Sequence, residues 1–328
     1  MMLFMKMIPF MKVVPCLLLT AASAAFAQTG YPAKPVRIVV PFAPGGGVDV
    51  TARILANELT QRMGRTFLVE NRTGASGVIG VEAVAKSAPD GYTLLAGSQT
   101  TQAVVPAIYQ GKVSYDTMRD FAAVAEIARS PFLIVVNQGL PVKSVGDLIR
   151  LAKEKPGELK FGAASGGTPH MAGELFKLAA GIDLLFVPYK GEGPAITDAM
   201  GGHISMVFSN LPVALPLARQ GKLRGIAVTS AQRVPTAPEF PTVAESGVPG
   251  FDAFSWFGLF APAATPREIV LKLNAEVVKA LNAPEAKEKM AAQGMFVTTA
   301  SAEQFGAFVK SEIPRWGKIV RDSGVKPE

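Results

Sequence analysis

Two glycine-rich segments of this sequence have the residue types and spacing to bind a small anion. The first, PFAPGGGVD at residues 41–49, follows an apolar run and precedes a helical pattern. The second, ASGGTPH at residues 164–170, stands in the same context. A strand that ends in glycines and leads into a helix presents free backbone N–H groups at the positive end of the helix dipole. Each segment therefore predicts an anion site formed mainly by the backbone, with a plain strand-to-helix turn as the alternative.

The first segment does not match the known nucleotide-binding loops. A dinucleotide fingerprint requires another glycine three residues after Gly47, where this chain has Val50. A P-loop ends in Gly-Lys-Ser/Thr, and no lysine lies between Lys34 and Lys86. The sequence therefore favours a small anion such as a carboxylate over a nucleotide.

The second segment also allows a hydrolase as an alternative. Residues 163–167 (AASGG) resemble the nucleophile elbow G-x-S-x-G, with alanine in place of the first glycine and Ser165 as the nucleophile. Only His203 follows at a suitable distance, with Asp183 or Asp198 between them. That span is shorter than an α/β-hydrolase sheet requires, so the chain is not expected to be an enzyme.

The first 27 residues predict a secretory signal peptide. Lys6 and Lys12 precede an apolar stretch at 13–25, which ends in the small-x-small cleavage pattern Ala25-Phe26-Ala27. Either Met1 or Met11 could be the true start. We expect cleavage before Gln28 and export to the periplasm.

The remaining composition excludes several other functions. Cys16 is the only cysteine and lies in the predicted leader, so the mature chain would have no thiol chemistry or disulfide. His170 and His203 are the only histidines, too few for a multi-histidine metal site. The 33 basic and 26 acidic residues form no long runs, which argues against nucleic-acid binding. We expect no metal and no cofactor.

Short apolar strands alternate with helical patterns along the whole chain, which indicates crossover connections and mostly parallel α/β sheets. The expected strands are 36–41, 66–70, 92–96, 121–127, 132–136, 159–163, 184–187, 204–208, 224–228 and 254–260. The expected helices are 49–63, 77–86, 144–154, 169–180, 194–200, 211–219, 266–281 and 301–320.

Two strand-like passages, at residues 129–132 and 247–252, predict crossings between two lobes. One lobe would consist of residues 28–130 and 252–328, and the other of residues 131–251. Each lobe would then contain one glycine-rich loop, and the two crossing strands would form a hinge. The two C-terminal helices would pack on the first lobe.

Several motifs occur in order along the mature chain: YPxKPVRIVVPFAPGG (31–46), ENRxGAxG (70–77), PDGYTL (89–94), GxxSxGTPH (162–170), VPYKG (187–191) and PTxxE (241–245). In this combination the chain resembles the Bug-type, TctC-like solute receptors of the tripartite tricarboxylate transporter family. The resemblance covers the whole mature chain.

The resemblance implies a two-lobed periplasmic binding protein that closes on a small organic acid and delivers it to a membrane permease. It places the ligand carboxylate between the loops at 42–47 and 164–170, and implies a monomer. The chain departs from many members at residues 96–102 (AGSQTTQ), which bears on ligand preference. A periplasmic ligand sensor is the alternative role. The expected ligand-binding residues are Phe42, Ala43, Pro44, Gly45, Gly46, Asp49, Ser98, Gln99, Thr100, Ser165, Gly166, Gly167, Thr168, His170, Tyr189, Ser209 and Asn210.

Four side chains near the loops allow more than one role. Asp49 suits the first turn of a helix or a ligand ammonium group. His170 suits a ligand contact or a local hydrogen bond. Thr168 can both contact the ligand and cap its helix, and Lys190 is the one cation expected near the cleft, although a solvated lysine is commoner.

Overall fold

The computed structural model describes residues 30–326, so the predicted leader and its cleavage site lie outside the described residues. Residues from Pro32 onward form one compact unit. Its strands are β1 Val36–Val40, β2 Phe67–Asn71, β3 Thr93–Ser98, β4 Phe121–Val136, β5 Lys160–Ala164, β6 Leu185–Tyr189, β7 Met206–Asn210, β8 Arg224–Val228, β9 Phe254–Pro262 and β10 Phe296–Val297.

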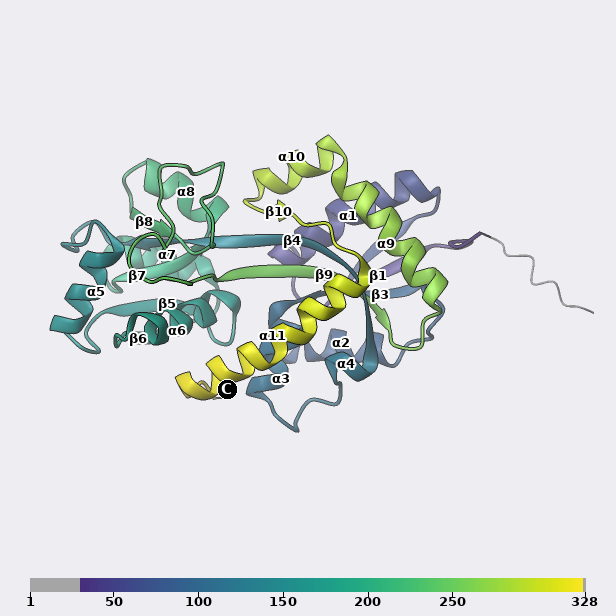
Figure 1. Ribbon diagram of the computed structural model, residues 1–328, viewed down its shortest axis with the longest axis horizontal. Helices are drawn as coiled ribbons and strands as arrows, with labels where there is room; N and C mark the ends of the chain where they lie inside the picture. The colour runs from purple at the N-terminus through teal and green to yellow at the C-terminus, as the bar shows by residue number, and fades with distance from the viewer. Residues whose placement is uncertain (1–29, 327–328) are drawn as a thin grey trace, which may run out of the picture. The chain divides into compact units, whose positions relative to one another are not determined.

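The helices cover the sheets and include every helix expected from the sequence (Figure 1). They are α1 Gly47–Met63, α2 Val78–Ala85, α3 Val105–Ile108, α4 Thr117–Asp120, α5 Val145–Glu154, α6 Thr168–Ala180, α7 Glu192–Gly201, α8 Leu211–Arg219, α9 Arg267–Asn282, α10 Pro284–Ala292 and α11 Ala302–Ser323, with short helical turns η1 Ala75–Gly77 and η2 Thr100–Val104. No helix among these residues is both long and apolar enough to cross a membrane.

The strands pair in the order β2-β1-β3-β9-β4-β7-β5-β6, with β8 and β10 also paired to β4. The pairs β1–β2, β1–β3, β5–β6 and β5–β7 are parallel, as the alternating pattern predicts. The expectation of mostly parallel sheets is wrong at the centre, because β4 and β9 are antiparallel to each other and to their other neighbours. The fold is therefore a two-lobed α/β fold with mixed sheets.

Strand β4 is one continuous element where the sequence predicts two strands. Its residues 121–131 pair with β9, and residues 132–136 pair with β7 and β8 (Figure 1). Pro131 is opposite Phe254 and does not interrupt the strand. The change of partner falls near the predicted crossing at residue 130.

Two separate apolar clusters form the cores on either side of this change. One is built around Trp256, Phe260 and Phe305, all at most 1% exposed. The other is built around Phe161, Phe176 and Phe208, all fully buried. Each sheet therefore buries its own aromatic core, which is what two lobes require.

Helix α11 begins with a capping box formed by Ser301 and Gln304. It packs on β4, as expected for a helix of the first lobe, but it also packs on α3 and α6 (Figure 1). Met171 of α6 and Trp316 of α11 belong to the same buried cluster. The prediction that the C-terminal helices pack on the first lobe did not include this second contact, which buries Trp316, Ile319 and Val320 against α6 and η2.

Candidate functional site

A cavity of about 540 Å³ brings the two glycine-rich loops together. Its walls come from both loops, from η1 and η2, from α3, from the segment between β6 and α7, and from the residues after α11. The lining residues are Phe42, Ala43, Pro44, Gly46, Ser76, Thr100, Val105, Ile108, Tyr109, Ala164, Ser165, Gly166, Gly167, Thr168, Pro169, Lys190, Gly191 and Lys326.

Three helices begin at this cavity without a side-chain cap. The residue before the first turn is Gly46 in α1, Gly167 in α6 and Gly191 in α7, and none of these helices has a capping side-chain hydrogen bond. All three glycines line the cavity. The first N–H groups of a helix have no partner within the helix, so an anion is the natural acceptor for them.

Thr168 adds an oriented hydroxyl group to the cavity wall. The Ser255 hydroxyl on β9 donates to Thr168 Oγ1 at 2.7 Å. In this bond Thr168 is the acceptor. The Thr168 hydroxyl can therefore still donate its own proton to another acceptor. Thr168 therefore suits a ligand oxygen.

An unexpected part of the wall is a left-handed turn at Gly74, Ala75, Ser76 and Gly77, with φ values of 127°, 48°, 54° and 94°. Positive φ is costly for Ala75 and Ser76, which carry a β-carbon. The turn brings Ser76 to the cavity. Sequence reasoning missed this residue, although the flanking glycines are a signal for unusual backbone.

The charged groups at the cavity are all positive. Lys190 and Lys326 line it, and no acidic residue does so within residues 30–326. Neither ammonium group has an ion-pair partner in this part of the chain. Lys190 is where the sequence placed a cation, whereas Lys326 was missed because it lies far away in sequence, beyond α11.

Nine of the residues expected to bind the ligand line the cavity, and eight do not. The lining members are Phe42, Ala43, Pro44, Gly46, Thr100, Ser165, Gly166, Gly167 and Thr168. The others are Gly45, Asp49, Ser98, Gln99, His170, Tyr189, Ser209 and Asn210, most of which are buried behind the wall or bound to other side chains.

Asp49 is buried behind the first loop. Its Oδ2 accepts from Gly45 N at 3.0 Å and from Arg53 Nε at 2.9 Å, and its Oδ1 accepts from Asn71 Nδ2 at 2.8 Å. Asn71 Nδ2 also donates to the Phe42 carbonyl. Burial raises the pKa of Asp49, but the hydrogen bonds from Arg53, Gly45 and Asn71 outweigh it and hold this pKa below its usual value.

Three predicted residues of the second lobe, Tyr189, Ser209 and Asn210, bind acidic side chains. Glu192 Oε1 accepts from the Ser209 hydroxyl at 2.5 Å and from Asn210 N at 2.7 Å. The Tyr189 hydroxyl donates to Asp198 at 2.6 Å, and burial together with this carboxylate raises the pKa of Tyr189 to about 12. These groups stiffen the wall from behind.

Ser98 and Gln99 are buried next to Thr100. Ser98 is 3% exposed and Gln99 is 1% exposed. Within the described part of the chain, Ser98 Oγ and Gln99 Oε1 have no hydrogen-bond partner. Ser98 is the last residue of β3, and Gln99 follows it directly, before the lining residue Thr100.

The hydrolase alternative finds no matching geometry. Within residues 30–326, Ser165 has no hydrogen bond to either histidine, and His170 Nδ1 instead accepts from Gly166 N at 3.0 Å. Asp198, one of the two proposed acids, is bound to Tyr189. Ser165 is placed as a wall residue of the cavity.

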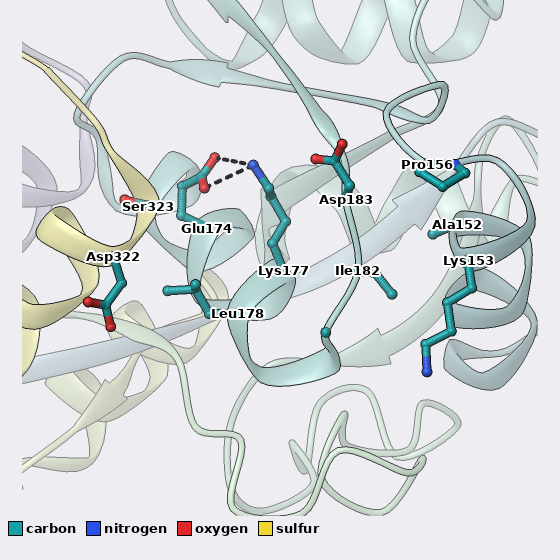
Figure 2. Close-up of a pocket in the computed structure, with 11 residues that line it drawn as sticks. Ala152, Lys153, Pro156, Glu174, Lys177, Leu178, Ile182, Asp183, Asp322 and Ser323 are labelled. Atoms are coloured by element: carbon teal, nitrogen blue, oxygen red, sulfur yellow. Dashed lines mark hydrogen bonds and ion pairs between the residues drawn. The ribbon is translucent and has the colours of Figure 1, made fainter.

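A second hollow of about 570 Å³ lies among α5, α6 and the end of α11 (Figure 2). Figure 2 shows Glu174 and Lys177 pointing toward each other, and their closest ion-pair distance is 3.1 Å. Its lining mixes Lys153 with Asp183 and Asp322 and includes no start of a helix. The hollow lacks the uncapped glycines that distinguish the first cavity.

The two-lobed α/β fold and a cavity walled by both glycine-rich loops define a solute-binding protein. The chain belongs to the tripartite tricarboxylate transporter family of receptors, whose model matches residues 51–325. It is 39% identical to protein BugT of Bordetella pertussis over 324 residues, which is 98% of this chain and 99% of BugT. Family and fold are those of substrate-binding proteins rather than enzymes.

Two of the similar solved structures are complexes with a carboxylate. R. palustris Rpa4515 with adipate is 39% identical, has a TM-score of 0.80, and is matched over 91% of this chain and 100% of its own. MatC (Rpa3494) from Rhodopseudomonas palustris with bound malate is 32% identical, with a TM-score of 0.75, over 88% of this chain and 100% of its own. The resemblance to Bug-type receptors is therefore confirmed.

Proposed function

We propose that this protein is a receptor that captures a small carboxylate, with dicarboxylates preferred, in the cavity between its two glycine-rich loops. The observation that carries this proposal is the convergence of three uncapped helix starts and two unpaired lysines on a cavity whose described lining has no acid. Backbone N–H groups and a helix dipole favour one carboxylate, and the lysines favour a second negative charge.

The relatives support a dicarboxylate. Adipate and malate, the ligands of Rpa4515 and MatC, each have two carboxylates. A thermal-shift comparison of adipate with hexanoate, which has the same chain length and one carboxylate, tests the preference. Ligand at 100 times its dissociation constant stabilises a protein by about 2.7 kcal/mol. A screen of mono-, di- and tricarboxylates and amino acids without any shift would contradict the proposal.

The same family suggests where and with which partner the protein works. We propose export to the periplasm after cleavage before Gln28, and delivery of the ligand to the permease of a tripartite tricarboxylate-type transporter by a monomeric receptor. N-terminal sequencing of exported protein tests the cleavage. Growth on the ligand after deletion of the genes for a tripartite tricarboxylate-type permease tests the partnership.

Thr168→Ala is expected to weaken carboxylate binding by about 0.5–1.5 kcal/mol, the net value of one hydrogen bond. The reason is that Thr168 lines the cavity and that its hydroxyl, which accepts a hydrogen bond from Ser255, can still donate one to a ligand oxygen. Titration calorimetry with adipate measures the change. Thr168→Ser keeps the hydroxyl and is the control, so equal losses in the two variants would contradict the assignment.

Ligand is expected to compact the protein. We propose lobes at residues 28–130 with 252–328 and at residues 131–251, with a hinge where β4 changes partner near residue 130 and where the chain returns near residue 252. A ligand held by both loops stabilises the closed arrangement because only that arrangement offers both sets of contacts. The radius of gyration in solution scattering should fall on adding adipate. An unchanged radius at saturation would mean a preformed cavity.

A further inference from the structure

The two anion-binding loops are held by the same hydrogen bond made with different side chains. In the first loop Gly45 N donates to Asp49 Oδ2, and in the second Gly166 N donates to His170 Nδ1, both at 3.0 Å. In each case the acceptor lies four residues after the glycine, in the first turn of the helix.

The backbone of the two loops also corresponds. Gly45 and Gly166 have positive φ values of 89° and 67°, and each directly precedes the uncapped glycine that starts its helix. Glycine adopts this positive φ without strain, and the N–H of each glycine points to a side chain in the first turn of the following helix. A side chain that accepts from Gly45 N or Gly166 N therefore fixes the peptide groups that lead into α1 or α6.

Neither acceptor is part of the cavity wall. Asp49 is 2% exposed and His170 is 3% exposed, and neither lines the cavity. Arg53 and Asn71 bind the Asp49 carboxylate from the other side. The His170 ring stacks on Phe186, with ring centroids 3.6 Å apart and planes 11° apart, and its Nε2 lies 3.7 Å from Glu174 Oε1. Both side chains are therefore fixed before any ligand arrives.

We propose that Asp49 and His170 are positioning residues, which act on the ligand only through the loops that they hold. This inference rests on the proposed function, because it says how that site is shaped. Each acceptor engages the N–H of the left-handed glycine and leaves the first N–H groups of α1 and α6 for the carboxylate. Since Asp49 is neutralised by Arg53 at 2.9 Å, its charge is compensated locally next to an anion site.

The two imidazole nitrogens of His170 allow a matched test. Asparagine places its amide near the position of Nδ1, and glutamine places its amide near the position of Nε2. His170→Asn therefore keeps an acceptor for Gly166 N, whereas His170→Gln does not. Both variants lose the aromatic stacking on Phe186. Asparagine is the smaller residue, so a loss that comes from packing alone would be larger in His170→Asn, the opposite of the expected order.

Amide exchange of Gly166 in the ligand-free protein, followed by NMR, gives a readout that needs no ligand. Exchange should stay slow in His170→Asn and become at least about tenfold faster in His170→Gln, the equivalent of about 1.4 kcal/mol. Equal exchange in the two variants would overturn the inference for His170, whatever the protein binds. The first loop is tested in the same way through the amide exchange of Gly45. Asp49→Asn keeps an acceptor oxygen for Gly45 N, whereas Asp49→Leu does not.

Adipate titration then connects the loop to the ligand. The dissociation constant should rise at least about tenfold in His170→Gln and by less than about threefold in His170→Asn. If exchange separates the variants but adipate affinity does not, the residues hold the loops without positioning them for a ligand. If the wild-type protein binds no acid at all, the proposed function fails, while the exchange result still decides whether His170 holds its loop.

Discussion

Gly46→Val is expected to abolish carboxylate binding and leave the fold intact. Gly46 starts α1 at the cavity, with φ −77° and ψ 166°, a conformation that valine adopts readily. A β-carbon added to Gly46 would meet only the Ala43 carbonyl oxygen, at 3.9 Å. The branched side chain therefore fits the folded protein but enters the space of the ligand. Titration with adipate should show affinity reduced by at least about 100-fold, or about 2.7 kcal/mol.

The matched control for this variant is Gly146→Val. Gly146 is exposed in the first turn of α5, and its added β-carbon would lie 3.7 Å from Ser144 Oγ, an ordinary contact. The Gly146→Val variant should bind adipate as the wild-type protein does. Wild-type affinity in a folded Gly46→Val would show that the ligand does not approach this loop. Gly167→Val is a less clean test, since its β-carbon would lie 3.0 Å from the Ala164 carbonyl oxygen.

Glu312→Ala is expected to cost about 3 kcal/mol of unfolding free energy, because it leaves buried donors without an acceptor. Glu312 is 3% exposed, and its Oε2 accepts from Trp256 Nε1 at 3.1 Å and from Trp316 Nε1 at 2.7 Å. Its Oε1 accepts from Arg315 Nη1 at 2.9 Å. One carboxylate therefore joins β9 to α11 and satisfies two buried indoles.

Urea unfolding of the two Glu312 variants measures this effect. Glu312→Gln keeps one carbonyl oxygen for the indole N–H groups and should lose clearly less stability than Glu312→Ala. Equal losses would mean that the cost comes from Arg315 rather than from the indoles. A loss below about 0.5 kcal/mol in Glu312→Ala, the level of an ordinary surface substitution, would contradict a structural role for the carboxylate.

The sequence predicts most elements of this fold because their signals are local. The apolar run 36–40 and the helical pattern after Asp49 determine β1 and α1 without help from the rest of the chain. The glycines of both loops are also local signals, and both loops line the cavity. The continuity of β4 was missed because Pro131 is a strand breaker by propensity, and only its pairing with β9 places it inside a strand.

The parts of the site that sequence reasoning missed depend on tertiary structure. Lys326 reaches the cavity only because α11 crosses from β4 to α6, which no local pattern contains. Ser209 and Asn210 are the last two residues of β7, but Glu192 binds both of them, and a sequence does not show which acid a hydroxyl group meets. Asp49 and His170 lie in the first turns of α1 and α6, next to the loops, as the sequence predicts. Their side chains accept hydrogen bonds from Gly45 N and Gly166 N and do not line the cavity.

The position of Lys326 has a consequence for how the protein is prepared. Lys326 lines the cavity that is proposed to bind the ligand. A polyhistidine tag fused a few residues after Lys326 would bring its own imidazoles close to the proposed binding site. Such a tag could compete with Lys190 for a dicarboxylate or add a spurious metal-dependent anion site.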